Sequence, residues 1–183
     1  MDFSEEILKK IEVVKTRIGA YPDFPKPGIC FRDIFSVYHD KDATIMLDEV
    51  MKYCAEQAVK RGVQVIAALE CRGFLFGPQM ALHMGVPFVP LRKKGKLPGK
   101  ILSLEYDLEY GKDTLEVQED SIPAGKKVLI VDDLLATGGS LQAACELVKK
   151  VGAEVSECLV VMEIVDLKGR TRVPAPVFSL IQF

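Results

Sequence analysis

The run Val128-Leu-Ile-Val-Asp-Asp-Leu-Leu-Ala-Thr-Gly-Gly-Ser140 places two adjacent carboxylates before a group of small and hydroxyl residues. Its four apolar residues predict a buried strand that emerges at Asp132 and Asp133, the edge where open α/β sheets bind ligands. Glycines in 136–140 let backbone N–H groups approach an anion, and a following helix adds partial positive charge. The run predicts a phosphate site with two acids able to hold sugar hydroxyls. A plain strand, acidic turn and capped helix remains the alternative, because a glycine pair is a weak signal.

Three further segments carry charged residues that could do chemistry. Glu70-Cys71-Arg72-Gly73 follows an apolar run, so it also falls at the edge of the sheet; the planar fork of arginine suits phosphate oxygens, although an exposed Arg capping a turn would look the same. The stretch 92–100 holds five cations and no acid, with glycine and proline at its hinges, which predicts a lid or, alternatively, a solvated basic turn. Glu109 is a lone carboxylate beside Tyr110, a pattern that spacing alone would assign to the surface.

The elements that must position these residues follow from apolar periodicity. The pattern predicts helices over 4–18, 40–60, 74–84 and 139–151, and strands over 63–69, 86–91, 101–106, 113–118, 127–133, 154–163 and 177–182. The first helix has an apolar stripe that includes Ile7, Leu8 and Ile11, and the Pro/Gly segment 21–28 after it is expected to be a loop. Strands alternating with helices predict an α/β domain with a largely parallel central sheet flanked by helices.

Composition narrows the class of protein. A chain of 183 residues suits one domain, and a net charge of −2 argues against a general nucleic-acid binder. Five scattered cysteines without a Cys-x-x-Cys pair are typical of reduced thiols in a cytoplasmic protein. The uncharged stretch 74–91 contains prolines, so we expect a helix, a turn and a strand there and no membrane span. Absence of the common ATP-binding and dinucleotide-binding glycine motifs weakens ATPase and dehydrogenase interpretations.

The run 128–140 resembles the phosphoribosyl pyrophosphate motif of type I phosphoribosyltransferases. Four more segments, 24–33, 72–78, 92–99 and 108–111, resemble the adenine phosphoribosyltransferases in order and spacing over nearly the whole chain. The resemblance implies the type I fold over 1–183 as one domain, with 1–35 forming an N-terminal helix and hood, and with a flexible lid loop. It also implies transfer of ribose 5-phosphate to adenine, giving AMP and pyrophosphate.

The same resemblance assigns roles to individual residues. Glu109 and Tyr110 are expected to be catalytic, Glu109 as the acid/base group facing the purine. Adenine is expected to bind through backbone groups of Cys30 and Arg32 with Phe31 stacked on the ring. Ribose and its 5′-phosphate are assigned to Asp132, Asp133, Ala136, Thr137, Gly138, Gly139 and Ser140, and pyrophosphate to Glu70, Cys71, Arg72, Arg92 and Lys96.

The resemblance also implies a peptide-bond conformation, a cofactor and an oligomeric state. Relatives have Asp and Ser in place of Glu70 and Cys71, with a cis peptide between them, so we expect a cis bond here too. Mg²⁺ is expected as cofactor, held mainly by substrate oxygens and water with no direct protein ligand. A homodimer without nucleic-acid or membrane partners is expected. Two alternatives stay open: a noncatalytic sensor of phosphoribosyl pyrophosphate, and an enzyme that uses hypoxanthine, guanine or xanthine.

Overall fold

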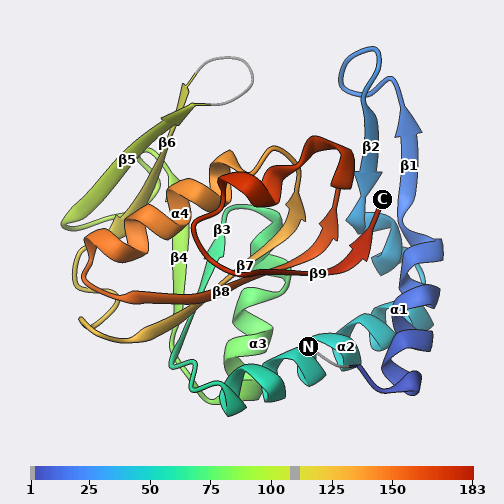
Figure 1. Ribbon diagram of the computed structural model, residues 1–183, viewed down its shortest axis with the longest axis horizontal. Coiled ribbons are helices and arrows are strands. Elements are labelled where there is room, and N and C mark those ends of the chain that lie inside the picture. The colour runs from blue at the N-terminus through green and yellow to red at the C-terminus, as the bar shows by residue number, and fades with distance from the viewer. Residues whose placement is uncertain (1–2, 108–111) are drawn as a thin grey trace. The chain divides into compact units, whose positions relative to one another are not determined.

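Residues 55–183 are built on a sheet of seven strands in the computed structural model, which describes residues 3–107 and 112–183. The elements of this unit are β3 (Val65–Leu69), α3 (Gly77–Met84), β4 (Phe88–Lys93), β5 (Ile101–Asp107), β6 (Lys112–Gln118), β7 (Lys127–Leu135), α4 (Gly139–Lys150), β8 (Glu154–Glu163) and β9 (Val177–Gln182). The strand order is β5-β6-β4-β3-β7-β8-β9 (Figure 1). From β4 to β9 neighbouring strands are parallel, whereas β6 joins β4 and β5 antiparallel. The predicted α/β class with a largely parallel sheet is confirmed.

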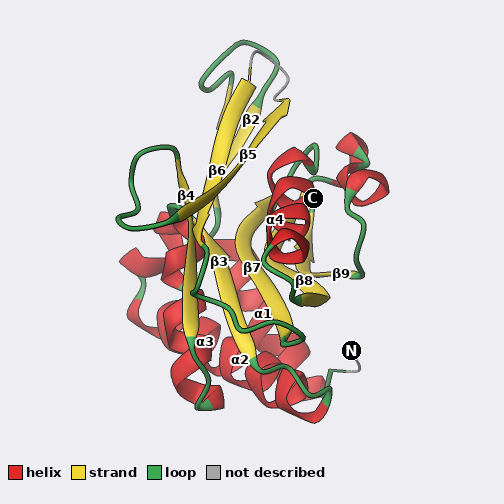
Figure 2. Cartoon of the chain, turned by 90° about the vertical axis from the view of Figure 1, so that its left-hand side faces the viewer, coloured by secondary structure: helices red, strands yellow, loops and turns green. Residues whose placement is uncertain are grey.

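Helices cover both faces of this sheet because its central strands are apolar on both sides. All five residues of β3 are buried. Val65 and Ala67 belong to the core in which α4 packs, whereas Ala68 points to the other face and lies against Gly77 of α3. Figure 2 shows α3 and α4 on opposite sides of β3 and β7. The carboxyl ends of β3 and β7 are thereby held side by side, with Ala68 opposite Val131 in the parallel register.

Residues 1–54 form a second compact unit, described here by itself. It contains α1 (Glu5–Arg17), a two-stranded antiparallel ribbon of β1 (Gly19–Pro22) and β2 (Cys30–Asp33), a 3₁₀ helix (Ile34–His39) and the first part of α2 (Lys41–Lys60). The Ser4 hydroxyl caps α1 by accepting the Ile7 N–H at 3.3 Å. The organisation of 1–183 as one domain, with 1–35 as a hood, stays a prediction.

Several expected details were wrong. Leu8 is 48% exposed, because the buried stripe of α1 follows Ile7, Ile11 and Val14 and Leu8 lies about 100° around the helix from Ile7. The segment 21–28 is not wholly a loop, since β1 extends to Pro22 and pairs with Cys30. The helix expected over 74–84 begins at Gly77, after a 3₁₀ turn over Arg72–Leu75. The strands expected over 101–106 and 113–118 are confirmed as β5 and β6, which pair antiparallel and are called the hairpin below. No helix in the described part of the chain is both long and apolar enough to cross a membrane.

Candidate active site

The carboxyl ends of β3 and β7 bring together an arginine and two acids. The Arg72 guanidinium donates from Nε to Oδ2 of Asp133, which is only 3% exposed. The Asp133 N–H donates to Oδ1 of the half-buried Asp132 at 2.9 Å. The two predicted acids therefore lie at the sheet edge that parallel pairing with β3 defines, with the predicted arginine across from them.

Burial raises the pKa of Asp132 well above its ordinary value, and the adjacent Asp133 raises it further. The Arg72 charge opposes this shift without cancelling it. Asp132 thus keeps a proton to higher pH than an exposed aspartate. A ligand that donates hydrogen bonds, as sugar hydroxyls do, would favour its charged form.

The loop 136–140, where the phosphate site is predicted, leads from β7 into α4. Gly138 adopts a left-handed conformation with φ of 84° and caps the helix. A side chain here would meet the backbone of Gly169, because an added Cβ would lie 2.3 Å from the Gly169 carbonyl oxygen. The loop therefore needs glycine at 138 for both its φ angle and its neighbour. Its backbone N–H groups lie at the N-terminus of α4, where helices bind anions.

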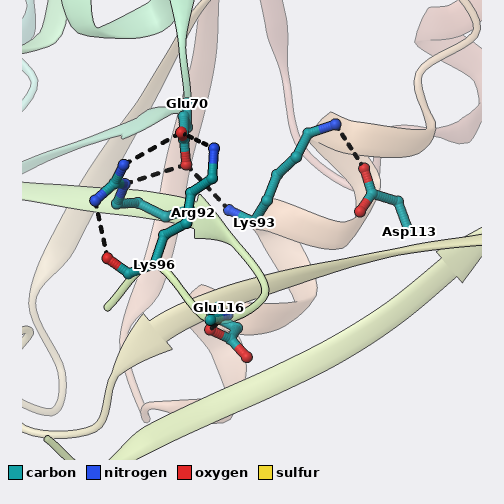
Figure 3. Close-up of polar contacts among 7 residues, drawn as sticks. Glu70, Arg92, Lys93, Lys96, Asp113 and Glu116 are labelled. Carbon is teal, nitrogen blue, oxygen red and sulfur yellow. Dashed lines mark hydrogen bonds and ion pairs between the residues drawn. The ribbon is translucent and has the colours of Figure 1, made fainter. Parts of the chain in front are cut away.

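Glu70 follows β3 and gathers the cations of the 92–100 loop. Its carboxylate accepts hydrogen bonds from Arg92 Nε at 3.1 Å and Nη2 at 3.2 Å, and from Lys96 Nζ at 2.5 Å (Figure 3). The Lys93 N–H donates to the same carboxylate at 3.3 Å. Burial alone would raise the pKa of Glu70, but the hydrogen bonds from Arg92 and Lys96 lower it to about 2. The Glu70–Cys71 peptide bond is cis, which confirms that expectation.

A second polar group lies on the hairpin and was not singled out from the sequence. Lys93 Nζ lies 2.9 Å from an Asp113 oxygen, and the Tyr106 hydroxyl donates to the same carboxylate at 3.4 Å. Burial raises the pKa of Tyr106, while the neighbouring Ser140 side chain lowers it in part. Tyr106 of β5 and Ser140 of α4 line the same cleft. No local sequence signal identifies this group, because its members meet only through strand pairing.

Most of these residues line one cleft of about 400 Å³. Of the predicted ligand residues it collects Glu70, Cys71, Arg72, Asp132, Asp133, Ala136, Thr137, Gly138, Gly139 and Ser140, and it adds Lys93, Tyr106 and Asp113. Arg92 and Lys96 do not line the cleft and reach it through Glu70. The arrangement offers donors to two separate anions, with Asp132 and Asp133 beside Arg72 in the same cleft.

The remaining predicted residues lie elsewhere. Glu109 and Tyr110 fall in 108–111, outside the described residues. Cys30, Phe31 and Arg32 form β2 of the unit 1–54; Cys30 is exposed and the other two are half-buried. Phe31 packs edge-on against Phe24, with ring centroids 5.3 Å apart. Their assignment to adenine stays a prediction.

The fold and the cleft together define a phosphoribosyltransferase, and residues 37–179 match the family described as phosphoribosyl transferase domain. The adenine phosphoribosyltransferase of Drosophila pseudoobscura pseudoobscura is 52% identical over 174 residues, which cover 95% of this chain and 96% of that protein. The Homo sapiens adenine phosphoribosyltransferase is 45% identical over 175 residues, covering 95% and 97%. The chain belongs to the adenine phosphoribosyltransferase family.

Solved structures agree with this assignment. The Saccharomyces cerevisiae adenine phosphoribosyltransferase, complexed with an imino-altritol bisphosphate and adenine, has a TM-score of 0.89 and 44% identity, covering 94% of this chain and 98% of that one. The Trypanosoma brucei enzyme, in complex with AMP, pyrophosphate and ribose-5-phosphate, has a TM-score of 0.80 and 26% identity, covering 100% and 82%.

Proposed function

We propose that this chain transfers ribose 5-phosphate from phosphoribosyl pyrophosphate to adenine, giving AMP and pyrophosphate, a reaction of purine salvage. The observation that carries the proposal is the pair Asp132 and Asp133 near the carboxyl end of β7, which ends at Leu135 and leads into the loop 136–140 at the start of α4. Acids and backbone donors separated in this way match a ribose with its 5′-phosphate. The structures of relatives with adenine, AMP and pyrophosphate bound support the choice of substrates.

Asp132 and Asp133 would accept the ribose hydroxyls, and the segment Ala136, Thr137, Gly138, Gly139 and Ser140 would hold the 5′-phosphate. Asp133 is already fixed by Arg72, so its carboxylate need not reorganise when the sugar arrives. The 5′-phosphate would face the backbone N–H groups of the loop, and Ser140 and Thr137 would add hydroxyl donors.

Pyrophosphate would bind on the opposite side of the ribose, near Glu70, Cys71 and Arg72, with Arg92 and Lys96 closing over it. The Glu70 N–H already donates to the Leu91 carbonyl at 2.9 Å. Backbone donation to pyrophosphate would therefore fall to Cys71 and Arg72. Arg72 is suited to this because its guanidinium offers several donors in one plane.

Mg²⁺ is the cofactor that the donor set of the cleft fits. Among the described residues no group of three or more His, Cys, Asp or Glu side chains could hold a metal alone. Mg²⁺ keeps waters and binds largely through substrate phosphates, so a cleft with two carboxylates is adequate. The chain would hold it indirectly, through the ribose oxygens bound by Asp132 and Asp133. When bound, it would offset the negative charge of the leaving group.

The bond between ribose C1 and pyrophosphate would break with positive charge building on the sugar, as in an oxocarbenium ion. The chain contributes position and electrostatics: Arg72, Arg92 and Lys96 would stabilise the departing charge. We assign to Glu109, with Tyr110 beside it, the role of accepting the proton from adenine N9. We assign recognition of adenine to β2. The Cys30 backbone would offer a C=O to the amino group and an N–H to N1, Phe31 would stack on the ring, and Arg32 would add backbone contacts. Each strand of a two-stranded ribbon has a second edge, which suits such backbone recognition.

We also infer a homodimer that works in the cytoplasm. None of the five cysteines is in a disulfide, as expected in a reducing compartment. Light scattering at twice the monomer mass would be expected, and a monomer at working concentration would contradict the dimer.

One assay tests the function. Pyrophosphate release should require adenine, phosphoribosyl pyrophosphate and Mg²⁺ together, with hypoxanthine, guanine and xanthine as the comparison bases. Equal turnover with hypoxanthine would contradict the choice of base. Binding of phosphoribosyl pyrophosphate without turnover of any base would indicate a sensor. Glu109→Gln should lower kcat by roughly 10²–10⁴, the usual effect of losing a general acid or base.

A further inference from the structure

The Glu70 carboxylate is surrounded by hydrogen-bond donors in the way that a bound anion would be. It accepts hydrogen bonds from both the Nε and the Nη2 of Arg92, from Lys96 Nζ, and from the Lys93 N–H (Figure 3). The side chain is only 9% exposed, whereas Arg92 and Lys96 are 33% and 47% exposed. A paired arginine fork on two oxygens is the geometry that arginine also uses for phosphate.

The turn that carries these cations has a second anchor of a different kind. The Gly95 N–H donates to Glu116 Oε2 at 2.8 Å, and Glu116 is 6% exposed. Arg92 Nη1 donates to the Lys96 carbonyl at 2.8 Å and closes the turn on itself. Glu116 therefore holds the backbone of the turn, while Glu70 holds its side-chain charges.

We propose that Glu70 is a placeholder for pyrophosphate: its carboxylate holds Arg92 and Lys96 at the cleft in the free protein and yields them to the ligand. This inference rests on the proposed function. Glu70 lines the cleft next to Arg72, so an incoming pyrophosphate competes with it for the same cations. Once the ligand is bound, the carboxylate lies near several like charges and weakens their binding. Glu70 is thus a positioning residue that favours release of pyrophosphate.

Two effects of removing this charge oppose each other, and their sizes decide the expected sign. Without the carboxylate the side chains of Arg92 and Lys96 are no longer held in place. They then lose conformational entropy when pyrophosphate binds, which weakens binding. Both side chains are already partly exposed, so this cost is limited. The repulsion between Glu70 and pyrophosphate involves several negative charges at short range in a partly buried cleft. The repulsion is therefore the larger effect, and removing it should strengthen binding.

The test is Glu70→Gln in the full chain, with inorganic pyrophosphate as the probe. Calorimetry should give a Kd on the order of tenfold lower than that of the parent chain. Trypsin should cleave within 92–100 faster in the ligand-free variant, and pyrophosphate should restore protection. A higher Kd for pyrophosphate would show that Glu70 only organises the site, and would overturn the proposal.

Matched variants separate charge from loop order. Glu116→Gln weakens the backbone anchor and leaves the Glu70 charge, so it should speed cleavage without lowering the Kd. Glu105→Gln, at an exposed carboxylate paired with Lys112, should change neither.

Glu70→Asp keeps the charge and is the variant to measure if Glu70→Gln does not fold. Its Kd for pyrophosphate should stay within about threefold of the parent value. A tenfold lower Kd in Glu70→Asp would overturn the proposal. If the parent chain binds no pyrophosphate at all, the proposed function itself fails.

Discussion

The loops 136–140 and 92–100 both offer positive potential to an anion, but they do so with different groups. In 136–140 the donors are backbone N–H groups at the start of α4, and Gly138 packs against the backbone of Gly169. In 92–100 the donors are long side chains. Glu70, just after β3, holds Arg92 and Lys96, and Glu116 of β6 accepts the backbone N–H of Gly95. The first loop is fixed by backbone geometry, and the second by contacts that can exchange partners.

This difference separates two tasks within one cleft. A 5′-phosphate is present in both substrate and product, so a site of fixed shape serves the whole reaction. Pyrophosphate must leave, so cations that already have an internal partner can let it go. Substitutions in the first loop should therefore affect folding and binding together, whereas those in the second should shift ligand affinity or pH behaviour.

The largest effect is expected from Gly138→Ala. The residue has φ of 84°, and the new Cβ would lie 2.3 Å from the Gly169 carbonyl oxygen, so the backbone must move. We expect the free energy of unfolding to fall by about 3 kcal/mol, with loss of phosphoribosyl pyrophosphate binding. Urea denaturation and calorimetry measure the two effects.

Gly95→Ala is the matched control in the other loop. Gly95 has φ of 79°, but nothing lies within 4 Å of the added Cβ. The cost should be the backbone strain alone, about 1–2 kcal/mol. Equal losses at both glycines would contradict the claim that 136–140 is the more rigid loop.

Asp132→Asn combined with Asp133→Asn should weaken phosphoribosyl pyrophosphate binding roughly 10–100-fold, because amides replace charged acceptors of ribose hydroxyls. Adenine binding should change much less. Calorimetry with each ligand measures this, and an unchanged affinity for phosphoribosyl pyrophosphate would show that the acids only pair with Arg72.

The same contrast explains what could be predicted from the sequence. The acids and the phosphate loop are contiguous in 128–140, and apolar residues before them predict the strand that delivers them to the sheet edge. The partners of Glu70 lie 22 to 26 residues away and meet it only because β3 and β4 are paired. The 92–100 stretch looked free of acids in sequence, yet Glu70 and Asp113 pair with its cations.

Short elements were the other source of error. The strands β1 and β2 have four residues each, and Pro22 ends the first, so no alternation indicates a ribbon. The turn over Arg72–Leu75 before α3 was assigned in part to the helix, because apolar residues continue through both. Strong periodicity in 40–60 predicted α2 within one residue at its start. Long patterned elements are thus predictable here, and side-chain partners across strands are not.

Glu70→Gln should change how stability depends on pH. The pKa of Glu70 lies at about 2 instead of its usual 4.5, so the charged form stabilises the fold above pH 4.5, and this contribution is lost as pH falls toward 2. At pH 7 the variant should be less stable by about 2 kcal/mol, a value reduced from the full shift because Lys96 is half exposed. Urea denaturation at pH 7 and pH 3 should show the difference shrinking; a constant difference would contradict the assigned pKa.

The smallest effect is expected from Tyr106→Phe, which tests whether the two sides of the cleft are connected. The Tyr106 hydroxyl donates to an Asp113 oxygen at 3.4 Å, and the Ser140 side chain of the phosphate loop lies close enough to lower the pKa of Tyr106. The bond to the Asp113 carboxylate is long, so we expect it to contribute only about 1 kcal/mol, below the usual range for a hydrogen bond to a charged group. The KM for phosphoribosyl pyrophosphate should therefore rise two- to fivefold. A double-mutant cycle with Ser140→Ala separates the contacts: if the hydroxyl acts through the phosphate loop, Tyr106→Phe should have little further effect in the Ser140→Ala background. Additive effects would instead show that Tyr106 acts through Asp113 and Lys93, and that the two sides of the cleft respond to ligands independently.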